Sequence, residues 1–234
     1  DYAMLEYCIR EDLKLKASRA MAVLDPIKLV IDNYPEGQTE ELEVDNNMEN
    51  PELGKRVVPF GREVYIERED FMEEPPKKYR RLYPGNEVRL MNAYFVTCTG
   101  FEKDEDGKVT VVHCTYDPES RGGNSPDGRK VRGTIHWVSA ADAVKAQVRL
   151  YENIIDEEKG VYNEDGSLNL NPNSLTVLDN CYVEPSLLKA EKYDSFQFVR
   201  NGFFCVDAKD STPEHPVFNR IVSLKSSYKL PTQA

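Results

Sequence analysis

The chain has 234 residues, of which 41 are acidic and 30 are basic, so its net charge is −11 at pH 7. This length allows one large domain or two small ones, each with its own hydrophobic core. The negative charge argues against a protein that coats nucleic acid with its whole surface, but it leaves room for one local basic site. No apolar run approaches the roughly 18 residues that a membrane-spanning helix needs.

Acidic and basic residues are separated along the chain. Residues 36–52 contain seven acidic residues and no Lys or Arg, whereas basic residues gather at 77–89 and at 129–132. An acidic body around a basic groove would repel RNA everywhere except at that groove.

The cysteines indicate a reducing environment. There are five of them, an odd number, without short regular spacing, and no apolar leader precedes them. We therefore expect a cytoplasmic protein. Cys98 and Cys114 can face each other across a hairpin, and we interpret them as two small core residues rather than a disulfide.

The first 16 residues predict an amphipathic helix. Leu5, Cys8, Ile9 and Leu13 recur at helical spacing, and lysines near the end favour the helix dipole. The stretch begins without Met. We expect it to be the tail of a preceding domain, and the chain to be the C-terminal part of a longer protein.

From Arg19 onward, short strand-like runs alternate with turn residues. The acidic segment 36–51 is predicted to be a long loop, as is 152–172, and short helical turns are expected near 139–142 and 185–189. Asn201-Gly202 predicts a hairpin turn. The expected strands are 20–24, 27–31, 57–60, 63–67, 89–101, 109–116, 132–138, 147–151, 196–198, 203–205 and 217–224. Many short strands with little helix predict barrels or a sandwich.

One basic stretch stands out, from Lys77 to Asn92. Four cationic side chains fall within residues 77–81, with Tyr79 between them. Cations attract phosphate, and a planar ring can stack on an unpaired base, so the pattern predicts binding of single-stranded nucleic acid. The alternative is an ordinary solvated surface.

Several segments match one family together. They are Arg56–Phe71, Lys77–Asn92, Cys114–Asp117, Gly128–Ala140, Phe196–Phe198 and Pro216–Arg220. With these segments the chain resembles, over nearly its whole length, the C-terminal anticodon-binding region of the glutaminyl-tRNA synthetase family, bacterial type, class I.

The resemblance implies a mainly β fold: two small β-barrels in tandem, with an N-terminal helix left over from the preceding helical subdomain. The expected parts are 1–17 for the helical tail, 18–72 with about 180–228 for a proximal barrel, 73–179 for a distal barrel, and 229–234 for a frayed tail.

The resemblance also implies the site residues. An anticodon reader needs cations for phosphates, planar side chains for stacking, and forked donors or amides for base edges. The matching contexts place Arg19 at the middle anticodon base, with Gln197 and Arg200 as its partners, and Arg81 at the final guanine. The full predicted RNA-binding set is Arg19, Lys77, Lys78, Tyr79, Arg80, Arg81, Arg89, Gln197 and Arg200. A second group that could extend the contacts is Asn46, Asn47, Arg129, Lys130 and Arg132.

Some predicted positions have alternative interpretations. Tyr79 can stack on a base or close off the core, and each arginine can instead pair with a nearby acid. Met91 replaces an Arg that the best-known bacterial members carry, and the loop 46–50 has diverged. The Met91 replacement puts the contact to the first anticodon base in doubt, and the divergence of the loop leaves its possible stacking or amide contacts unassigned.

The sequence offers no catalytic or metal site. The three histidines, His113, His136 and His215, are dispersed, and no Cys or His pair has metal-ligand spacing. Asp104 and Asp106 before Gly107 resemble the start of a calcium loop, but the remaining ligands are missing, so a hairpin turn is expected. Trp137 is expected in the core.

We therefore predict a binding module. The family's ATP-binding motifs are absent, so no cofactor is expected in this chain and ATP belongs to the parent's catalytic domain. The implied partners are the anticodon loop of glutamine tRNA and that catalytic domain, and a monomer is expected. Alternatives are a related glutamyl-tRNA synthetase, a β-barrel protein-interaction module and, remotely, a small hydrolase. The segment Gly128–Trp137 favours the glutaminyl enzyme.

Overall fold

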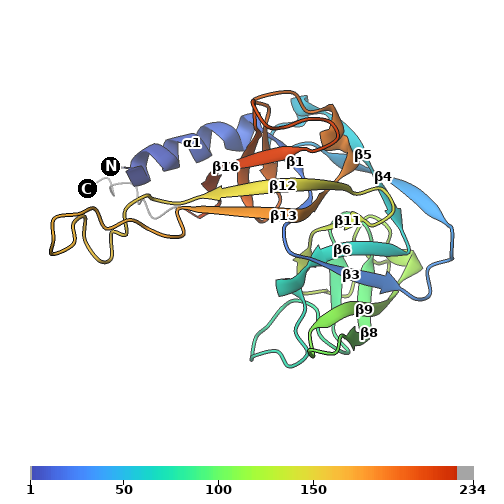
Figure 1. The fold of residues 1–234 in the computed structure, drawn as a ribbon. Helices are drawn as coiled ribbons and strands as arrows, with labels where there is room; N and C mark the ends of the chain where they lie inside the picture. Colours follow the sequence, from blue (N-terminus) through green and yellow to red (C-terminus); the bar gives the residue numbers. More distant parts are fainter. Residues whose placement is uncertain (1, 226–234) are drawn as a thin grey trace, which may run out of the picture.

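The computed structural model describes residues 2–225, and these form a mainly β protein with one long helix (Figure 1). The helix α1 (Tyr2–Lys16) lies along an upper body, and a second body lies below it. Each body is built on one barrel-shaped, nearly closed sheet of seven strands. The predicted fold class is confirmed. The predicted tail, 229–234, lies outside the described residues.

The upper sheet is made from both ends of the chain. Its order is β1-β14-β15-β16-β12-β13-β2. The strands are β1 (Ser18–Ala20), β2 (Ala22–Val23), β12 (Val144–Tyr151), β13 (Leu175–Val183), β14 (Ser195–Phe198), β15 (Gly202–Val206) and β16 (Val217–Ser223). The two edge strands, β1 and β2, are separated by Met21 alone. The sheet therefore returns to its own beginning, which leaves little free edge.

The lower sheet closes in the same way. Its order is β10-β7-β8-β9-β3-β6-β11. The strands are β3 (Pro26–Ile31), β6 (Glu63–Glu67), β7 (Glu87–Leu90), β8 (Phe95–Lys103), β9 (Val109–Tyr116), β10 (Thr134–Ile135) and β11 (Trp137–Ser139). Here the edge strands β10 and β11 flank His136. The stretch predicted as one strand is thus split, because its halves pair with β7 and β6 on opposite edges.

The predicted assignment of strands to barrels is wrong for four strands. We grouped residues 18–72 with the C-terminal strands, yet β3 and β6 pair in the lower sheet with β9 and β11. Conversely, β12 and residues 175–179 of β13 fall in the predicted distal segment 73–179 but belong to the upper sheet. The chain crosses between the barrels twice, and hydrophobic pattern along a sequence does not reveal which strands pair.

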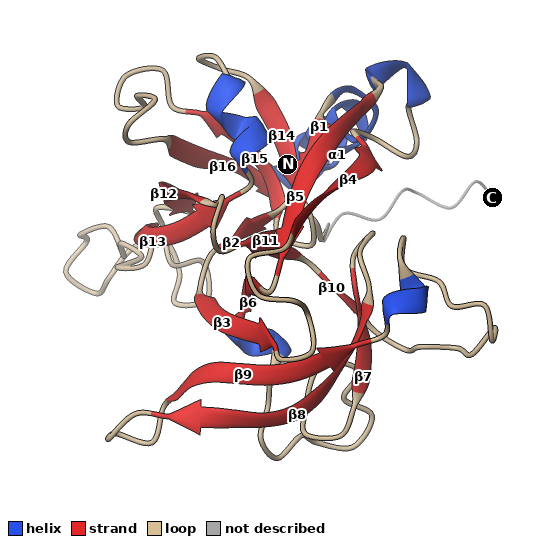
Figure 2. Cartoon of the chain, turned by 90° about the vertical axis from the view of Figure 1, so that its right-hand side faces the viewer, coloured by secondary structure: helices blue, strands red, loops and turns tan. Residues whose placement is uncertain are grey.

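The segment predicted to be a long acidic loop contains a strand. β4 (Thr39–Asp45) pairs antiparallel with β5 (Lys55–Gly61) over seven residue pairs. Leu42 and Val44 face inward and are buried, while Glu41, Glu43 and Asp45, which alternate with them, are exposed. The high charge concealed an alternation with a period of two residues. Figure 2 shows this ribbon running beside both bodies.

Buried ion pairs and tyrosines attach the ribbon to both sheets. On the upper side, Arg56 of β5 pairs with Glu184, whose side chain is 1% exposed. On the lower side, Glu40 of β4 accepts hydrogen bonds from the hydroxyls of Tyr34 and Tyr94, at 2.8 and 2.7 Å. Arg121 also pairs with Glu40, at 3.0 Å. The ribbon therefore spans the two bodies as a brace.

Short features follow the sequence closely. Asp104 accepts hydrogen bonds from two backbone N–H groups of the β8–β9 turn, which confirms a plain hairpin turn. Cys98 lies opposite Cys114 on these strands. Both are buried and neither forms a disulfide, as predicted. Trp137 is fully buried. The single-turn helices are η1 (Pro51–Leu53), η2 (Arg68–Asp70), η3 (Pro118–Ser120) and η4 (Pro185–Lys189). Residues 140–142 form a turn rather than a helix.

Among the described residues, α1 is the only helix longer than five residues, and none has the length and apolar character to cross a membrane.

The buried pair between Arg56 and Glu184 yields a stability prediction. Glu184 also accepts a hydrogen bond from the N–H of Met21 at 2.8 Å. The substitution Glu184→Gln removes the counter-charge of a guanidinium that is 13% exposed. We expect it to lower the free energy of unfolding by about 3 kcal/mol, measured by urea denaturation. The exposed Glu191→Gln serves as the control, and an equal, small loss in both variants would contradict this role.

His113 yields a prediction for pH. Its ring lies 2.9 Å from Glu102 and 3.0 Å from Asp32, and these hydrogen bonds raise its pKa above the ordinary value of 6.5. The contribution to stability is therefore fully present below about pH 6.5 and is lost as the pH rises through the raised pKa. His113→Gln should lower the urea midpoint at about pH 6 far more than at about pH 9. Glu102→Gln should weaken this pH dependence. If His113→Gln lowered the urea midpoint equally at both pH values, the role given to the charged ring would be wrong.

Candidate nucleic-acid interface

The basic loop, residues 72–86, is held by backbone contacts at its base. Phe71 and Leu82 form a parallel bridge, and Leu82 donates its N–H to the carbonyl of Asp70 at 2.9 Å. Gly133 packs against the same loop. A Cβ atom at Gly133 would lie 1.9 Å from the carbonyl oxygen of Arg80, so only glycine permits this approach. The loop is thereby fixed beside β10.

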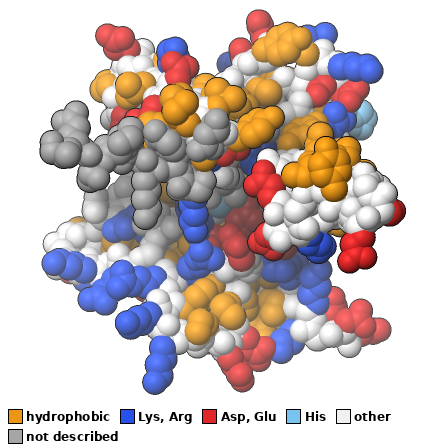
Figure 3. All heavy atoms as spheres, turned by 90° about the vertical axis from the view of Figure 1, so that its left-hand side faces the viewer, with side chains coloured by type: hydrophobic (Ala, Val, Ile, Leu, Met, Phe, Trp, Pro, Cys, Tyr) orange, Lys and Arg blue, Asp and Glu red, His pale blue; other side chains and the backbone are white. Residues whose placement is uncertain are grey.

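Several cations of this region are free. The exposed residues Lys77, Lys78, Arg80, Lys130 and Arg132 make no hydrogen bond or ion pair with another described residue. Figure 3 shows Lys and Arg side chains gathered over the lower part of the molecule on the side that it presents. Unpaired cations on one face are what a phosphate backbone requires.

Arg81 and Arg200 converge on one buried carboxylate. Arg200 donates two hydrogen bonds to Asp70, at 2.6 and 2.8 Å, and the Nε of Arg81 lies 3.4 Å from the same Asp70 oxygen that accepts the longer bond. The side chain of Asp70 is fully buried, whereas those of Arg81 and Arg200 are 39% and 27% exposed. Each guanidinium thus keeps part of its surface for another partner.

The cluster continues inward through His136. Arg200 donates to Nδ1 of His136 at 3.1 Å, and Nε2 of His136 lies 3.2 Å from Glu67. Because an arginine N–H can only donate, Nδ1 accepts and Nε2 carries the hydrogen that is donated to Glu67. Glu67 also accepts from the N–H groups of Leu24 and Asp25, at 2.7 and 3.1 Å. The network links both sheets.

The pKa shifts agree with this geometry. The hydrogen bonds that Arg200 donates to the carboxylate of Asp70 raise the pKa of Arg200, despite its burial. For Glu67, burial favours the neutral acid, but the bonds from His136 and the two backbone N–H groups outweigh it and lower the pKa. Burial raises the pKa of Tyr79 to about 12. At neutral pH, Glu67 is therefore ionised and Tyr79 keeps its proton.

Tyr79 contacts the segment that contains Asp70. Its hydroxyl donates to the carbonyl of Glu69 at 2.9 Å, and its ring lies 6.2 Å from that of Tyr83. The ring is half-buried. Tyr79 is placed beside the two arginines, so both interpretations, stacking on a base and covering the interior, are compatible with its position.

Arg19 and Gln197 meet as predicted. They are paired residues of the parallel strands β1 and β14, and both line a pocket of about 310 Å³. Helix α1 supplies one wall, through Tyr7, Arg10, Glu11 and Lys14. Glu49 lies 3.4 Å from both Arg19 and Lys14. Arg200, predicted as a partner of this pair, instead lies three residues beyond Gln197 and turns to Asp70.

Two residues that line this pocket, Arg10 and Arg19, each have one buried side-chain nitrogen without a hydrogen-bond partner within residues 2–225. Among the described residues, three buried side-chain N or O atoms have no hydrogen-bond partner, and two of them are Nη1 of Arg10 and Nε of Arg19. Unsatisfied buried donors are uncommon and call for a partner.

Other predicted residues have structural partners. Asn47 is 1% exposed and donates to the carbonyls of Lys14 and Ala17, which secures the end of α1. Asn46 donates to the carbonyl of Leu53. The side chain of Met91 packs against the lower core.

Arg89 and Arg129 are also engaged. Arg89 donates to the carbonyl of Gly123 and to Thr134, and lies over the ring of Phe95. Arg129 pairs with three carboxylates, which are Glu87, Asp117 and Asp127. These bonds raise the pKa of Arg129, Glu87 having the largest effect. Neither guanidinium is free for phosphate in this structure.

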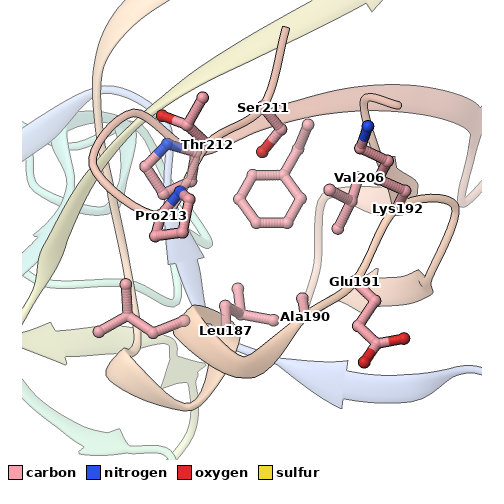
Figure 4. A pocket seen from close by; sticks show the side chains of 11 residues that line it. Leu187, Ala190, Glu191, Lys192, Val206, Ser211, Thr212 and Pro213 are labelled. Atoms are coloured by element: carbon pink, nitrogen blue, oxygen red, sulfur yellow. The ribbon is translucent and has the colours of Figure 1, made fainter. Parts of the chain in front are cut away.

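A further pocket of about 280 Å³ lies away from all the predicted residues (Figure 4). It is bordered by η4 and β15, and Leu187 and Val206 give it an apolar wall. Within residues 2–225, no group of three or more His, Cys, Asp or Glu side chains is placed to hold a metal ion.

Comparison with known proteins identifies the family. The sequence matches the family described as "tRNA synthetases class I (E and Q), anti-codon binding domain" over residues 17–117 and again over 134–207. This chain belongs to that family. The two matches together span most of both barrels, including the basic loop.

Its relatives are much longer proteins. The chain is 54% identical to a glutamine–tRNA ligase of Clostridium kluyveri over 233 residues, 99% of this chain and 42% of the relative. It is 55% identical to that of Clostridium perfringens, over 98% of this chain and 42% of the relative. It is 52% identical to the glutamine–tRNA ligase of Vibrio vulnificus, over 97% of this chain and 41% of the relative. The chain thus spans about two fifths of the length of these relatives.

Sequence reasoning missed three acidic residues of the site. Asp70, Glu67 and Glu49 each contact a predicted arginine or its network, yet none lies in the basic stretch from Lys77 to Asn92 that drew attention. Asp70 follows Glu69 in a short charged run that looks like ordinary surface. No local signal marks a carboxylate that becomes buried by folding.

The contrast between Arg129 and Lys130 gives a test of which cations are free. Arg129→Ala removes three ion pairs and should lower the urea midpoint, while the salt dependence of RNA binding stays unchanged. Lys130→Ala should leave stability unchanged and, if it meets a phosphate, reduce the slope of log K against log salt by about 0.7. The reverse pattern would show that Arg129 is the phosphate contact.

Proposed function

We propose that this chain reads the anticodon of glutamine tRNA for a glutaminyl-tRNA synthetase. The observation that carries the proposal is the pocket shared by Arg19 and Gln197, which Arg10 and Lys14 of helix α1 also line. Its volume of about 310 Å³ lies at the low end for ligand pockets. Arg19 offers a forked guanidinium donor and Gln197 an amide. These are groups that can hydrogen-bond the edge of one flipped-out base.

The free cations supply the second element. Phosphates would lie along Lys77, Lys78, Arg80, Lys130 and Arg132, none of which is paired within the described residues. Binding through them releases counterions and depends steeply on salt. The acidic outer face of the ribbon β4–β5 would repel RNA and confine it to this side.

Arg81 is the proposed reader of the last anticodon base. Its guanidinium is 39% exposed and is oriented by Asp70 and by the carbonyl of Glu69, at 3.4 and 3.2 Å. An oriented arginine fork suits the two acceptors of guanine. Glutamine anticodons end in guanine, so the position of Arg81 fits recognition of a glutamine anticodon.

The rest of the proposal concerns the parent enzyme. There, a catalytic domain would join glutamine to the tRNA with ATP, and this chain would supply recognition alone. The five free cysteines support a reducing, cytoplasmic setting.

The proposal is tested by fluorescence titration of this chain with glutamine tRNA and with a tRNA altered at the last anticodon base. Arg81→Ala should cost about 1 to 3 kcal/mol of binding free energy for the cognate tRNA and flatten discrimination at that base. Arg80→Ala is the matched control, because Arg80 is the exposed neighbour of Arg81 and is proposed to contact phosphate. Its loss should weaken the binding of all tRNAs equally and reduce the salt dependence of binding.

Three outcomes would contradict the proposal or the role of Arg81 in it. A wild-type chain that binds both tRNAs equally, with little salt dependence, would be a protein-interaction module. A preference for glutamate tRNA would favour a glutamyl enzyme. If Arg81→Ala weakened every tRNA equally, Arg81 would be a phosphate contact.

A further inference from the structure

Glu49 places a carboxylate in a pocket whose other charged groups are mostly cations. It lines the pocket of about 310 Å³ together with Arg19 and Gln197. Its Oε1 lies 3.4 Å from Nη2 of Arg19, and its Oε2 lies 3.4 Å from Nζ of Lys14. One carboxylate therefore faces two cations that belong to different elements, strand β1 and helix α1.

The backbone of Glu49 is held in place by asparagines on both sides. Asn47 is buried, donates to the carbonyl of Ala17 at 3.1 Å, and accepts from the N–H of Glu49 at 2.9 Å. Asn50 donates to the carbonyl of Leu15 at 2.8 Å. The loop is thus tied to the end of α1 by side-chain hydrogen bonds, so that Glu49 is presented to the pocket on a fixed backbone.

The carboxylate of Glu49 retains acceptor capacity for a further partner. Its side chain is 41% exposed, and both of its contacts, at 3.4 Å, are longer than the roughly 2.7–2.9 Å of a charge-assisted hydrogen bond. The side chains of Arg19 and Gln197 make no hydrogen bond with another residue of the described range. The pocket therefore offers an open acceptor beside the open donors of a guanidinium and an amide.

This set of groups matches one pyrimidine better than the other. The middle base of a glutamine anticodon is uracil, whose Watson–Crick edge presents a carbonyl oxygen, the N3–H donor and a second carbonyl oxygen. Cytosine presents an amino group, an N3 without hydrogen and a carbonyl oxygen, so the two bases differ at the centre of this edge. An ionised carboxylate can only accept. It therefore pairs with N3–H of uracil but meets a lone pair at N3 of cytosine.

We propose that Glu49 is a specificity-determining residue that selects uracil over cytosine as the middle anticodon base. This inference deepens the proposed function and rests on it, because the base lies in the pocket of Arg19 and Gln197 in both. Glu49 accepts from N3–H, while Arg19 and Gln197 donate to the carbonyl oxygens. A donor at the carbonyl that both pyrimidines share suits either base, so an acceptor at N3 adds the rejection of cytosine.

The experiment compares how variants discriminate between the two bases. The chain is titrated with the anticodon arm of glutamine tRNA, and with the same arm carrying cytosine at the middle position. Glu49→Gln keeps the shape of the side chain, but its amide can donate to N3 of cytosine as well as accept from uracil. We expect the ratio of the two affinities to fall by about tenfold, chiefly because the cytosine arm binds more tightly.

Glu11→Gln is the matched control. Glu11 lines the same pocket from helix α1, but its carboxylate makes no ion pair with another residue within 2–225. Both substitutions remove one negative charge beside the RNA, so some general gain in affinity is expected from each. Only Glu49→Gln should change the ratio between the uracil and cytosine arms. Because the ion pairs of Glu49 are partly exposed, its loss should leave the melting temperature nearly unchanged.

The outcomes separate this inference from the function on which it rests. A third arm, altered at the last anticodon base, is included for this purpose. If the wild-type chain binds all three arms equally, the proposed function fails. If it discriminates at the last base alone, or if Glu49→Gln leaves the ratio of uracil to cytosine unchanged, the function stands and the role of Glu49 is overturned. An equal gain for every arm in both variants would reduce Glu49 to a charge that opposes RNA.

Discussion

The arrangement of this protein depends on the buried ion pair between Asp70 and Arg200. Both barrels are nearly closed, so neither offers a free strand edge through which the other could extend its sheet. The bodies must therefore be joined by side chains. Asp70 and Glu67 supply two buried carboxylates at this junction, and the stacked rings of Tyr65 and Tyr182, 4.2 Å apart, supply apolar contact. Burying charge is costly unless it is fully paired, which makes the junction specific in geometry.

The residues at which the two barrels close also contact buried acids at or near the junction between them. Each sheet closes at a single residue between its two edge strands, Met21 in the upper sheet and His136 in the lower. Buried acids engage both, since Glu184 accepts from the N–H of Met21 and Glu67 from the ring of His136. In our proposal, Arg19 and Gln197 lie on the strands β1 and β14 beside the closure at Met21, and the free cations lie on loops near the closure at His136.

Pairing divides the cations into two kinds. Arg56, Arg129 and Arg200 are bound by carboxylates and hold the fold together, whereas the exposed lysines near 77 and 130 are not paired within the described residues. With a net charge of −11, the free cations form a local exception on an acidic molecule. Such a contrast of potential guides a polyanion to one face.

The sequence by itself determined the β character, the helix α1, most strand positions and the presence of a basic, aromatic loop, because these follow from local periodicity, turn residues and charge. It also brought Arg19 and Gln197 together through resemblance. Only the tertiary structure decided which strands share a barrel, that residues 39–45 form a strand, and that Arg200 turns to Asp70 rather than to Arg19. Strand pairing and burial of a carboxylate depend on residues far apart in the chain, and no local pattern records which distant partner will neutralise a charge.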